Sequence, residues 1–202
     1  MNTTKKILFV AAVLSAAWST AARAVVSIGA PAPDFSVTDI QGKTHRLADH
    51  KGKIVVLEWT NPQCPFVQKH YESGNIPQLQ KTATSDGIVW FAIESARGKS
   101  GQAEDAKAAA WLKEQKAAPT AYLRDADMSV ARLYGAKATP HLFIIDASGV
   151  LVYNGAIDSI RSADKADIAK AENYVTSALA ALKAGQPVAK SATQPYGCAV
   201  KY

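Results

Sequence analysis

A strand-length apolar run that ends in a sharp turn is the feature that most restricts how this chain can fold. Residues 54–59 read Ile-Val-Val-Leu-Glu-Trp, a β-branched and aromatic run that suits a central strand covered on both faces. An Asn-Pro-Gln turn follows, and a helical stretch is expected over residues 64–79, with interruptions at Gly74 and Pro77. This order places Cys64 at the start of a helix, directly after a buried strand.

The rest of the chain alternates strand and helix signals. Further strands are expected at residues 87–93, 121–123, 142–145 and 150–153, and helices at residues 103–116, 128–134 and 165–183. Asp127 is the expected N-cap of the second of these helices, and Gly135 its terminator. Residues 39–43 read as a hairpin turn. The order predicts an α/β fold, with a mixed central sheet flanked by helices and an N-terminal β-hairpin extension.

The first 24 residues have the pattern of a secretory signal peptide. Lys5 and Lys6 precede an apolar run over residues 7–17, and small residues follow up to Ala24. The run is shorter than the about 20 apolar residues that a membrane-spanning helix needs, although an uncleaved anchor is the alternative. We expect cleavage after Ala24, a periplasmic or secreted location, and no stable membrane association once the leader is removed.

Charge and size exclude some classes of function. The leader carries three basic residues and no acid, so the formal charge of +6 falls to about +3 without it, which is too mild for nucleic-acid binding. Residues 25–184 are expected to form one domain, and residues 185–202 a tail that carries Cys198. Because a domain of this size buries its core without covalent help, its two cysteines are not needed as scaffolding. In an oxidising compartment they are open to redox chemistry.

Cys64 and Pro140 are the candidate reactive pair. The N–H groups and the dipole at a helix start favour a thiolate, and can lower a cysteine pKa from about 8.5 to roughly 3.5–7.5. Pro65 suits the first helical position. The Thr139–Pro140 bond lies at a tight strand entry, so we expect it to be cis, with the Thr139 backbone facing outward to pair with an extended substrate. The alternatives are an inert buried cysteine and a proline that starts an edge strand.

These motifs resemble the thioredoxin-like superfamily over nearly all of the chain after the leader. Residues 30–35, Ala-Pro-Ala-Pro-Asp-Phe, resemble the opening of peroxiredoxins and periplasmic thioredoxin-like reductases, and residues 58–67 resemble the thioredoxin active-site strand and loop. The Cys-Pro-Phe segment and the Tyr-Gly-Cys tail are similar to those of bacterial peroxiredoxin-like redoxin-domain proteins, of the alkyl hydroperoxide reductase and thiol-specific antioxidant type. The resemblance implies a thioredoxin-like fold and a substrate site formed by Trp59, Pro65, Phe66, Thr139 and Pro140.

Two positions depart from the patterns of these families. Val67 takes the place of the second cysteine of the thioredoxin Cys-X-X-Cys motif, which is also where peroxiredoxins keep their attacking cysteine. Thr139-Pro140-His141 stands where peroxiredoxins place an arginine. No disulfide can therefore close within the motif, and efficient peroxide reduction is not expected.

Glu58 and Cys198 are the other candidate catalytic residues. Glu58 lies at the offset before Cys64 at which thioredoxins place a buried acid, and a desolvated carboxyl there can relay a proton; the alternative is a side chain that faces water. Cys198 lies in a tail expected to be flexible, with Tyr196 and Tyr202 as possible anchors. Three roles are open for Cys198: it resolves Cys64, it forms a structural disulfide that stabilises the fold by about 4–5 kcal/mol, or it acts independently.

The sequence predicts an exported thiol–disulfide oxidoreductase. Cys64 attacks a protein or small-molecule disulfide beside Pro140, and Cys198 or an external thiol reductant resolves the product. The alternatives are a peroxiredoxin-like thiol peroxidase with an antioxidant role, and a non-catalytic module with a locked Cys64–Cys198 bond. No cofactor is expected, and no metal, because the histidines lack metal-ligand spacing. A solvated face is expected for three residues that follow on the helix, Lys69, His70 and Tyr71.

Overall fold

The computed structural model describes residues 26–96, 98 and 101–202. The expected leader, residues 1–24, and its cleavage point lie outside the described residues. Within the described ranges, no helix is long and apolar enough to cross a membrane.

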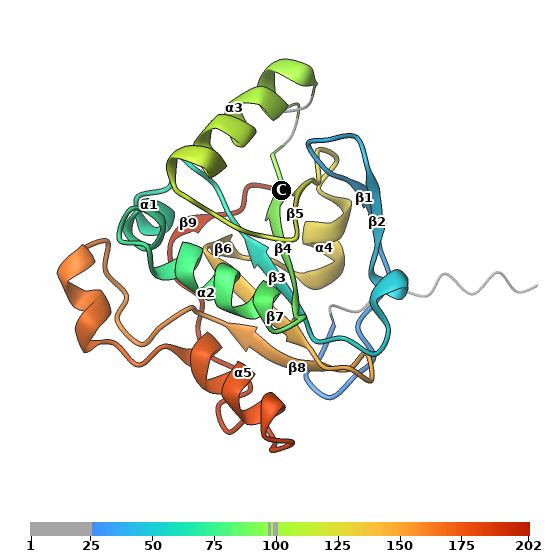
Figure 1. Ribbon diagram of the computed structural model, residues 1–202, viewed down its shortest axis with the longest axis vertical. Coiled ribbons are helices and arrows are strands. Elements are labelled where there is room, and N and C mark those ends of the chain that lie inside the picture. The colour runs from blue at the N-terminus through green and yellow to red at the C-terminus, as the bar shows by residue number, and fades with distance from the viewer. Residues whose placement is uncertain (1–25, 97, 99–100) are drawn as a thin grey trace, which may run out of the picture.

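A five-stranded mixed sheet forms the centre of the molecule (Figure 1). Its strands, in the order β5-β4-β3-β7-β8, are β5 (Ala121–Arg124), β4 (Val89–Glu94), β3 (Val55–Trp59), β7 (His141–Ile145) and β8 (Leu151–Gly155). β3, β4 and β5 run parallel, whereas β7 is antiparallel to both β3 and β8. The predicted mixed sheet is confirmed, with the Ile-Val-Val-Leu-Glu-Trp run at its centre.

Helices and a hairpin cover the two faces of this sheet (Figure 1). One face packs against α1 (Pro65–Glu72), α2 (Asn75–Ser85) and α5 (Tyr174–Lys183). The other packs against α4 (Ser129–Tyr134), the hairpin of β1 (Ser36–Thr38) and β2 (Thr44–Arg46), and the 3-10 helix η1 (Leu47–His50). α3 (Gln102–Glu114) packs through Ala108 against β4 and β5. The buried side chains of β3 alternate between the two cores.

The helical stretch after Cys64 divides at Gly74, as predicted. α1 ends at Glu72, and Gly74 adopts a φ of +78° at the N-cap of α2. Pro77 does not interrupt the helix, contrary to expectation. It lies in the first turn of α2, where backbone N–H groups have no helical partner, so the missing N–H of proline breaks no hydrogen bond. α2 therefore continues to Ser85.

The cap of α4 also differs from expectation. Met128, not Asp127, is the N-cap residue, and buried Asp125 accepts hydrogen bonds from the backbone N–H groups of Val130 and Ala131. Gly135 ends the helix with a φ of +65°, as predicted.

The prediction of a single helix over residues 165–183 is wrong. A 3-10 helix, η2 (Lys165–Lys170), precedes α5 instead. Asp158 and Asn173 form an antiparallel bridge, and the backbone is extended at Ala171 and Asn173, between the two helices. The Asn173 side chain then caps α5 by accepting the Thr176 N–H. Contacts with a distant loop override the helical periodicity.

The C-terminal tail is packed onto the sheet rather than flexible. The Asn154 N–H of β8 donates to the Ser191 carbonyl at 2.9 Å, and the Thr193 N–H donates back to the Asn154 carbonyl at 3.1 Å. The tail continues to β9 (Cys198–Ala199), which pairs antiparallel with β6 (Ala138–Thr139) and is drawn in red in Figure 1. The tail thus brings Cys198 to the start of β7.

Candidate active site

Cys64 lies at the start of α1, as predicted. The turn between β3 and α1 is built by Asn61, whose side chain accepts the Gln63 N–H at 2.9 Å and whose carbonyl accepts the Cys64 N–H at 2.9 Å. Cys64 is the N-cap residue, with an extended φ of −83° and ψ of 122°, and Pro65 is the first helical residue. The Cys64 side chain is only 1% exposed.

Thr139, Pro140 and Cys198 surround the Cys64 sulfur. The Thr139–Pro140 peptide bond is cis, as predicted. The Cys64 thiol donates to the Thr139 carbonyl, with 3.0 Å between Sγ and O. Cys198 lies opposite Thr139 in the β6–β9 pair, and its thiol is hydrogen-bonded to Cys64. No disulfide joins the two thiols in this structure.

The two thiols have opposite acidities. Burial opposes ionisation of Cys64, but donors around its sulfur outweigh burial and lower its pKa below the ordinary value; these are the Cys198 thiol, the Thr139 side chain and the backbone N–H groups of Val67 and Cys198. Burial, together with the hydrogen bond and the charge of Cys64, raises the pKa of Cys198 to about 11. Cys64 is therefore the more acidic thiol of the pair, and Cys198 keeps its proton at neutral pH.

Gly197 allows the tail to pass directly over Thr139. Its φ is +126°, and a Cβ atom at this position would lie 2.0 Å from the Thr139 carbonyl oxygen. Beyond β9, the Val200 N–H donates to the Lys137 carbonyl at 3.1 Å. The edge at which an extended substrate was expected to pair thus holds a strand of the same chain.

The other residues of the predicted substrate site differ in their exposure. Pro65 is exposed, whereas Phe66 is partly buried and packs edge-on against the Tyr196 ring, with 5.8 Å between centroids. Trp59 is buried, and its indole N–H donates to Ser95. Trp59 also forms part of the wall of a cavity of about 530 Å³ that reaches Thr139 and Cys198. Substrate contact by these residues stays a prediction.

Glu58 faces the core, so the alternative that it faces water is wrong. Its carboxylate accepts hydrogen bonds from the Tyr71 hydroxyl at 2.8 Å, the Gln80 amide at 3.0 Å and the Trp90 indole at 2.7 Å. Burial raises its pKa, although these donors act in the opposite direction. Its role as a proton relay stays a prediction.

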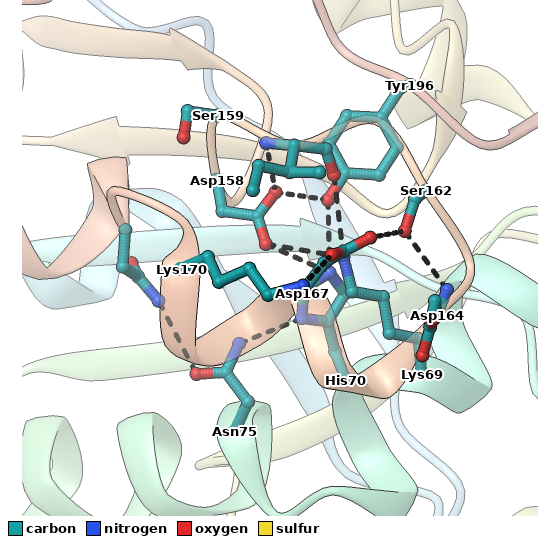
Figure 2. A network of polar contacts seen from close by, with 12 residues as sticks. Lys69, His70, Asn75, Asp158, Ser159, Ser162, Asp164, Asp167, Lys170 and Tyr196 are labelled. Atoms are coloured by element: carbon teal, nitrogen blue, oxygen red, sulfur yellow. Dashed lines mark hydrogen bonds and ion pairs between the residues drawn. The ribbon is translucent and has the colours of Figure 1, made fainter.

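A buried polar network joins α1 to the tail. The expectation of a solvated face for Lys69, His70 and Tyr71 is wrong, because each is at most 1% exposed. The Lys69 ammonium lies 3.6 Å from the Asp158 carboxylate, and the Tyr196 hydroxyl donates to Asp158 and lies 3.2 Å from His70 Nε2 (Figure 2). No local spacing marks this network, since His70 and Tyr196 are 126 positions apart.

Metal ligation has no support in the part of the chain that the structure describes. No cluster of three or more His, Cys, Asp or Glu side chains there is arranged to hold an ion.

Comparisons with known proteins agree with this geometry. Residues 28–154 match the AhpC/TSA family. The chain is 26% identical, over 127 residues that make up 63% of it and 68% of the relative, to the thiol-disulfide oxidoreductase ResA of Geobacillus thermodenitrificans strain NG80-2. The crystal structure of a hypothetical protein from Sinorhizobium meliloti 1021 superposes with a TM-score of 0.72 at 26% identity, over 89% of this chain and 96% of that one.

A further solved structure identifies the fold. The thioredoxin domain of a thiol-disulfide oxidoreductase from Bacteroides vulgatus superposes with a TM-score of 0.51 at 19% identity, over 72% of this chain and 96% of that one. The thioredoxin-like fold is thus confirmed. The family match includes Cys64 and Pro140 but ends before the tail that carries Cys198.

Proposed function

The chain belongs to the AhpC/TSA family, and on that basis we propose that it is a thiol–disulfide oxidoreductase in which Cys64 attacks and Cys198 resolves. The observation that carries this proposal is the contact between the two thiols beside the cis Pro140. The sequence similarity to the thiol-disulfide oxidoreductase ResA supports it. The substrate is a protein or small-molecule disulfide.

The first step uses the thiolate of Cys64. It attacks one sulfur of the substrate disulfide, the substrate S–S bond breaks, and a mixed disulfide forms between Cys64 and that sulfur. The departing sulfur leaves as a thiolate and takes up a proton. The donors from Val67 and Cys198 that stabilise the Cys64 thiolate also fix where the attacking sulfur lies.

The second step uses Cys198. Once Cys64 is in a mixed disulfide it carries no negative charge, so one of the causes that raise the Cys198 pKa is removed. Cys198 then gives up its proton to solvent, and its thiolate attacks Cys64 Sγ. The Cys64–substrate S–S bond breaks, and the second substrate sulfur leaves as a thiolate that takes up a proton. Two electrons have passed from the two cysteines to the substrate, and an external thiol reductant returns the Cys64–Cys198 disulfide to two thiols.

The surroundings of Cys64 favour this reaction over peroxide reduction. Val67, at the position of the peroxiredoxin cysteine, is a fully buried core residue. His141 follows the cis proline, and burial lowers its pKa to about 4, so that it is neutral near pH 7 and supplies no positive charge for polarising an O–O bond.

An extracytoplasmic location completes the proposal. It is supported by the leader pattern that ends at Ala24. Cleavage of the leader is tested by N-terminal sequencing of the exported protein.

The test is reaction of the reduced protein with oxidised glutathione, followed by mass-spectrometric mapping of the disulfides. Wild type is expected to form the Cys64–Cys198 disulfide reversibly. Cys198→Ser is expected to accumulate glutathione on Cys64, whereas Cys64→Ser is expected to form neither product at a comparable rate. A pair that never links, or a linked pair that dithiothreitol does not open, would contradict the proposal.

Peroxide serves as the matched alternative oxidant. The reduced protein is expected to consume hydrogen peroxide no faster than free cysteine in a stopped-flow experiment. Faster consumption that depends on Cys64 would favour the peroxidase function instead.

A further inference from the structure

We propose that Tyr196 is a positioning residue for the exchange between Cys64 and Cys198: its hydroxyl, held by Asp158 and His70, determines whether the tail presents Cys198 to Cys64. This inference rests on the proposed function and deepens it. Figure 2 shows the Tyr196 ring reaching into a polar cluster formed by α1 and by the loop after β8.

The hydrogen bonds of the cluster leave the Tyr196 hydroxyl one orientation. The Asn75 amide donates to His70 Nδ1 at 2.8 Å, so the imidazole proton lies on Nε2. His70 Nε2 then donates to the Tyr196 oxygen at 3.2 Å, and the Tyr196 O–H donates to Asp158 Oδ1. The burial that lowers the pKa of His70 to about 4 keeps the imidazole in this neutral form. The Tyr196 hydroxyl therefore accepts one hydrogen bond, from His70, and donates its proton to another, to Asp158.

Charge balance explains why the carboxylate is available to Tyr196. Asp158 is buried, and its other oxygen lies 3.6 Å from the Lys69 ammonium, which in turn donates to the Ile160 carbonyl at 3.4 Å. Buried ion pairs contribute little net stability, because desolvation offsets their attraction. This ion pair holds the Asp158 carboxylate in place, so that it can accept the hydroxyl of Tyr196 in the tail.

The same helix holds the ring of Tyr196 and the sulfur of Cys64. Phe66 packs edge-on against the ring, and the Lys69 ammonium lies 5.9 Å from its centroid. Both residues lie on α1, which begins directly after Cys64. One helix therefore fixes the Tyr196 ring relative to Cys64, its N-cap residue, while Asp158 in the loop after β8 accepts the hydroxyl.

The chain between Tyr196 and Cys198 is too short to let Cys198 move far while Tyr196 is held. Cys198 lies two residues after Tyr196, and two residues span at most about 7 Å. Between them, Gly197 is in contact with the Thr139 carbonyl, which also accepts the Cys64 thiol. Once the hydroxyl is bound, Cys198 is confined to the neighbourhood of Cys64; without it, only the short β6–β9 pairing and the Val200–Lys137 hydrogen bond hold this end of the tail.

The experiment compares Tyr196→Phe with wild type in a glutathione redox titration. The variant keeps the ring and its contact with Phe66 but leaves Asp158 and His70 without the hydroxyl. We expect the equilibrium constant for forming the Cys64–Cys198 disulfide to fall about tenfold or more, with glutathione accumulating on Cys64 instead. We also expect the Cys64 pKa to rise, because the donors from Cys198 move away.

Tyr134→Phe is the matched control. It also removes a buried hydroxyl, one that donates to the Pro33 carbonyl at 2.7 Å on the opposite face of the sheet. It is expected to change the equilibrium constant less than about twofold even if it lowers stability. If both variants retain the wild-type constant, the positioning role is wrong and the proposed function stands. If wild type itself forms no reversible Cys64–Cys198 disulfide, the proposed function is wrong.

Discussion

Cys64 and Cys198 differ in acidity although their thiols are in contact. Cys64 gains donors from two sides, from the start of α1 and from the tail, and these lower its pKa despite burial. Burial raises the pKa of Cys198 to about 11, together with its role as donor in this contact and the charge of Cys64. Burial and the hydrogen bonds around the two sulfur atoms thus leave Cys64 the more acidic thiol and Cys198 the proton-bearing one.

This asymmetry predicts how each thiol responds when the other is removed. In Cys198→Ala, the pKa of Cys64 is expected to rise, because a donor to the thiolate is lost. In Cys64→Ala, the pKa of Cys198 is expected to fall from about 11 towards its ordinary value, with burial still holding it above that value. The ultraviolet absorbance of the thiolate, followed against pH in each single-cysteine variant, measures both. Wild-type Cys64 that titrates as an ordinary thiol would contradict the assignment of the nucleophile.

Elements whose causes lie within a few neighbouring residues were predictable from the sequence. β3, the helix start at Cys64 and the cis Pro140 depend on a β-branched run, a turn with proline and a strand entry, all of which are visible locally. The end of α4 at Gly135 belongs to the same class. Such elements form in the same way independently of contacts with distant segments.

Elements that depend on distant partners were not predictable. Residues 165–183 have helical periodicity throughout, yet the bridge between Asp158 and Asn173 divides them. β9 is too short to show any periodicity, and its existence depends on β6. The burial of His70 likewise depends on Tyr196, at the other end of the chain.

The contact of β9 with β6 predicts a specific effect of enlarging Gly197. In Gly197→Ala, the new methyl group would overlap the Thr139 carbonyl, so β9 is expected to move away and uncover Cys64. A maleimide reagent should then modify Cys64 about tenfold faster or more than in wild type.

Gly185→Ala is the control for this variant. Gly185 also has a positive φ, +67°, but a Cβ atom there meets nothing within 4 Å. Gly185→Ala therefore places an alanine at a positive φ, with the same kind of backbone strain, but without overlap with a neighbouring atom. Cys64 is expected to react at the wild-type rate in this variant. Equal acceleration in both variants would assign the effect to general loosening of the tail.

At the scale of the whole molecule, the buried ionisable groups make stability depend on pH in a predictable direction. Burial lowers the pKa of both His70 and His141 to about 4, from an ordinary 6.5. Folding therefore requires both to be neutral, and their contribution is full above pH 6.5 and is lost as the pH falls towards 4. Burial raises the pKa of Glu58, so its effect on stability has the opposite pH dependence. The stability that comes from protonated Glu58 is lost as the pH rises through its folded-state pKa.

His141→Gln isolates one of these contributions. The free energy of unfolding of wild type, relative to that of the variant, is expected to fall by about 2–3 kcal/mol between pH 7 and pH 4.5. Urea unfolding at the two pH values measures the difference. His50→Gln is the comparison, since His50 is only partly buried and its pKa is lowered for the same reason, so its effect should be smaller. A difference that does not change with pH would show that folded His141 titrates like an ordinary histidine.

The strand that covers Cys64 follows every other described element along the chain. Loss of this strand alone is therefore expected to expose the Cys64 sulfur while the central sheet and α1 stay in place. In that state a low-molecular-weight disulfide exchanges with the Cys64 thiolate, forms a mixed disulfide and releases its other half as a thiol, and Cys198 is not at hand to displace it. The docked tail thus decides which sulfur Cys64 is joined to.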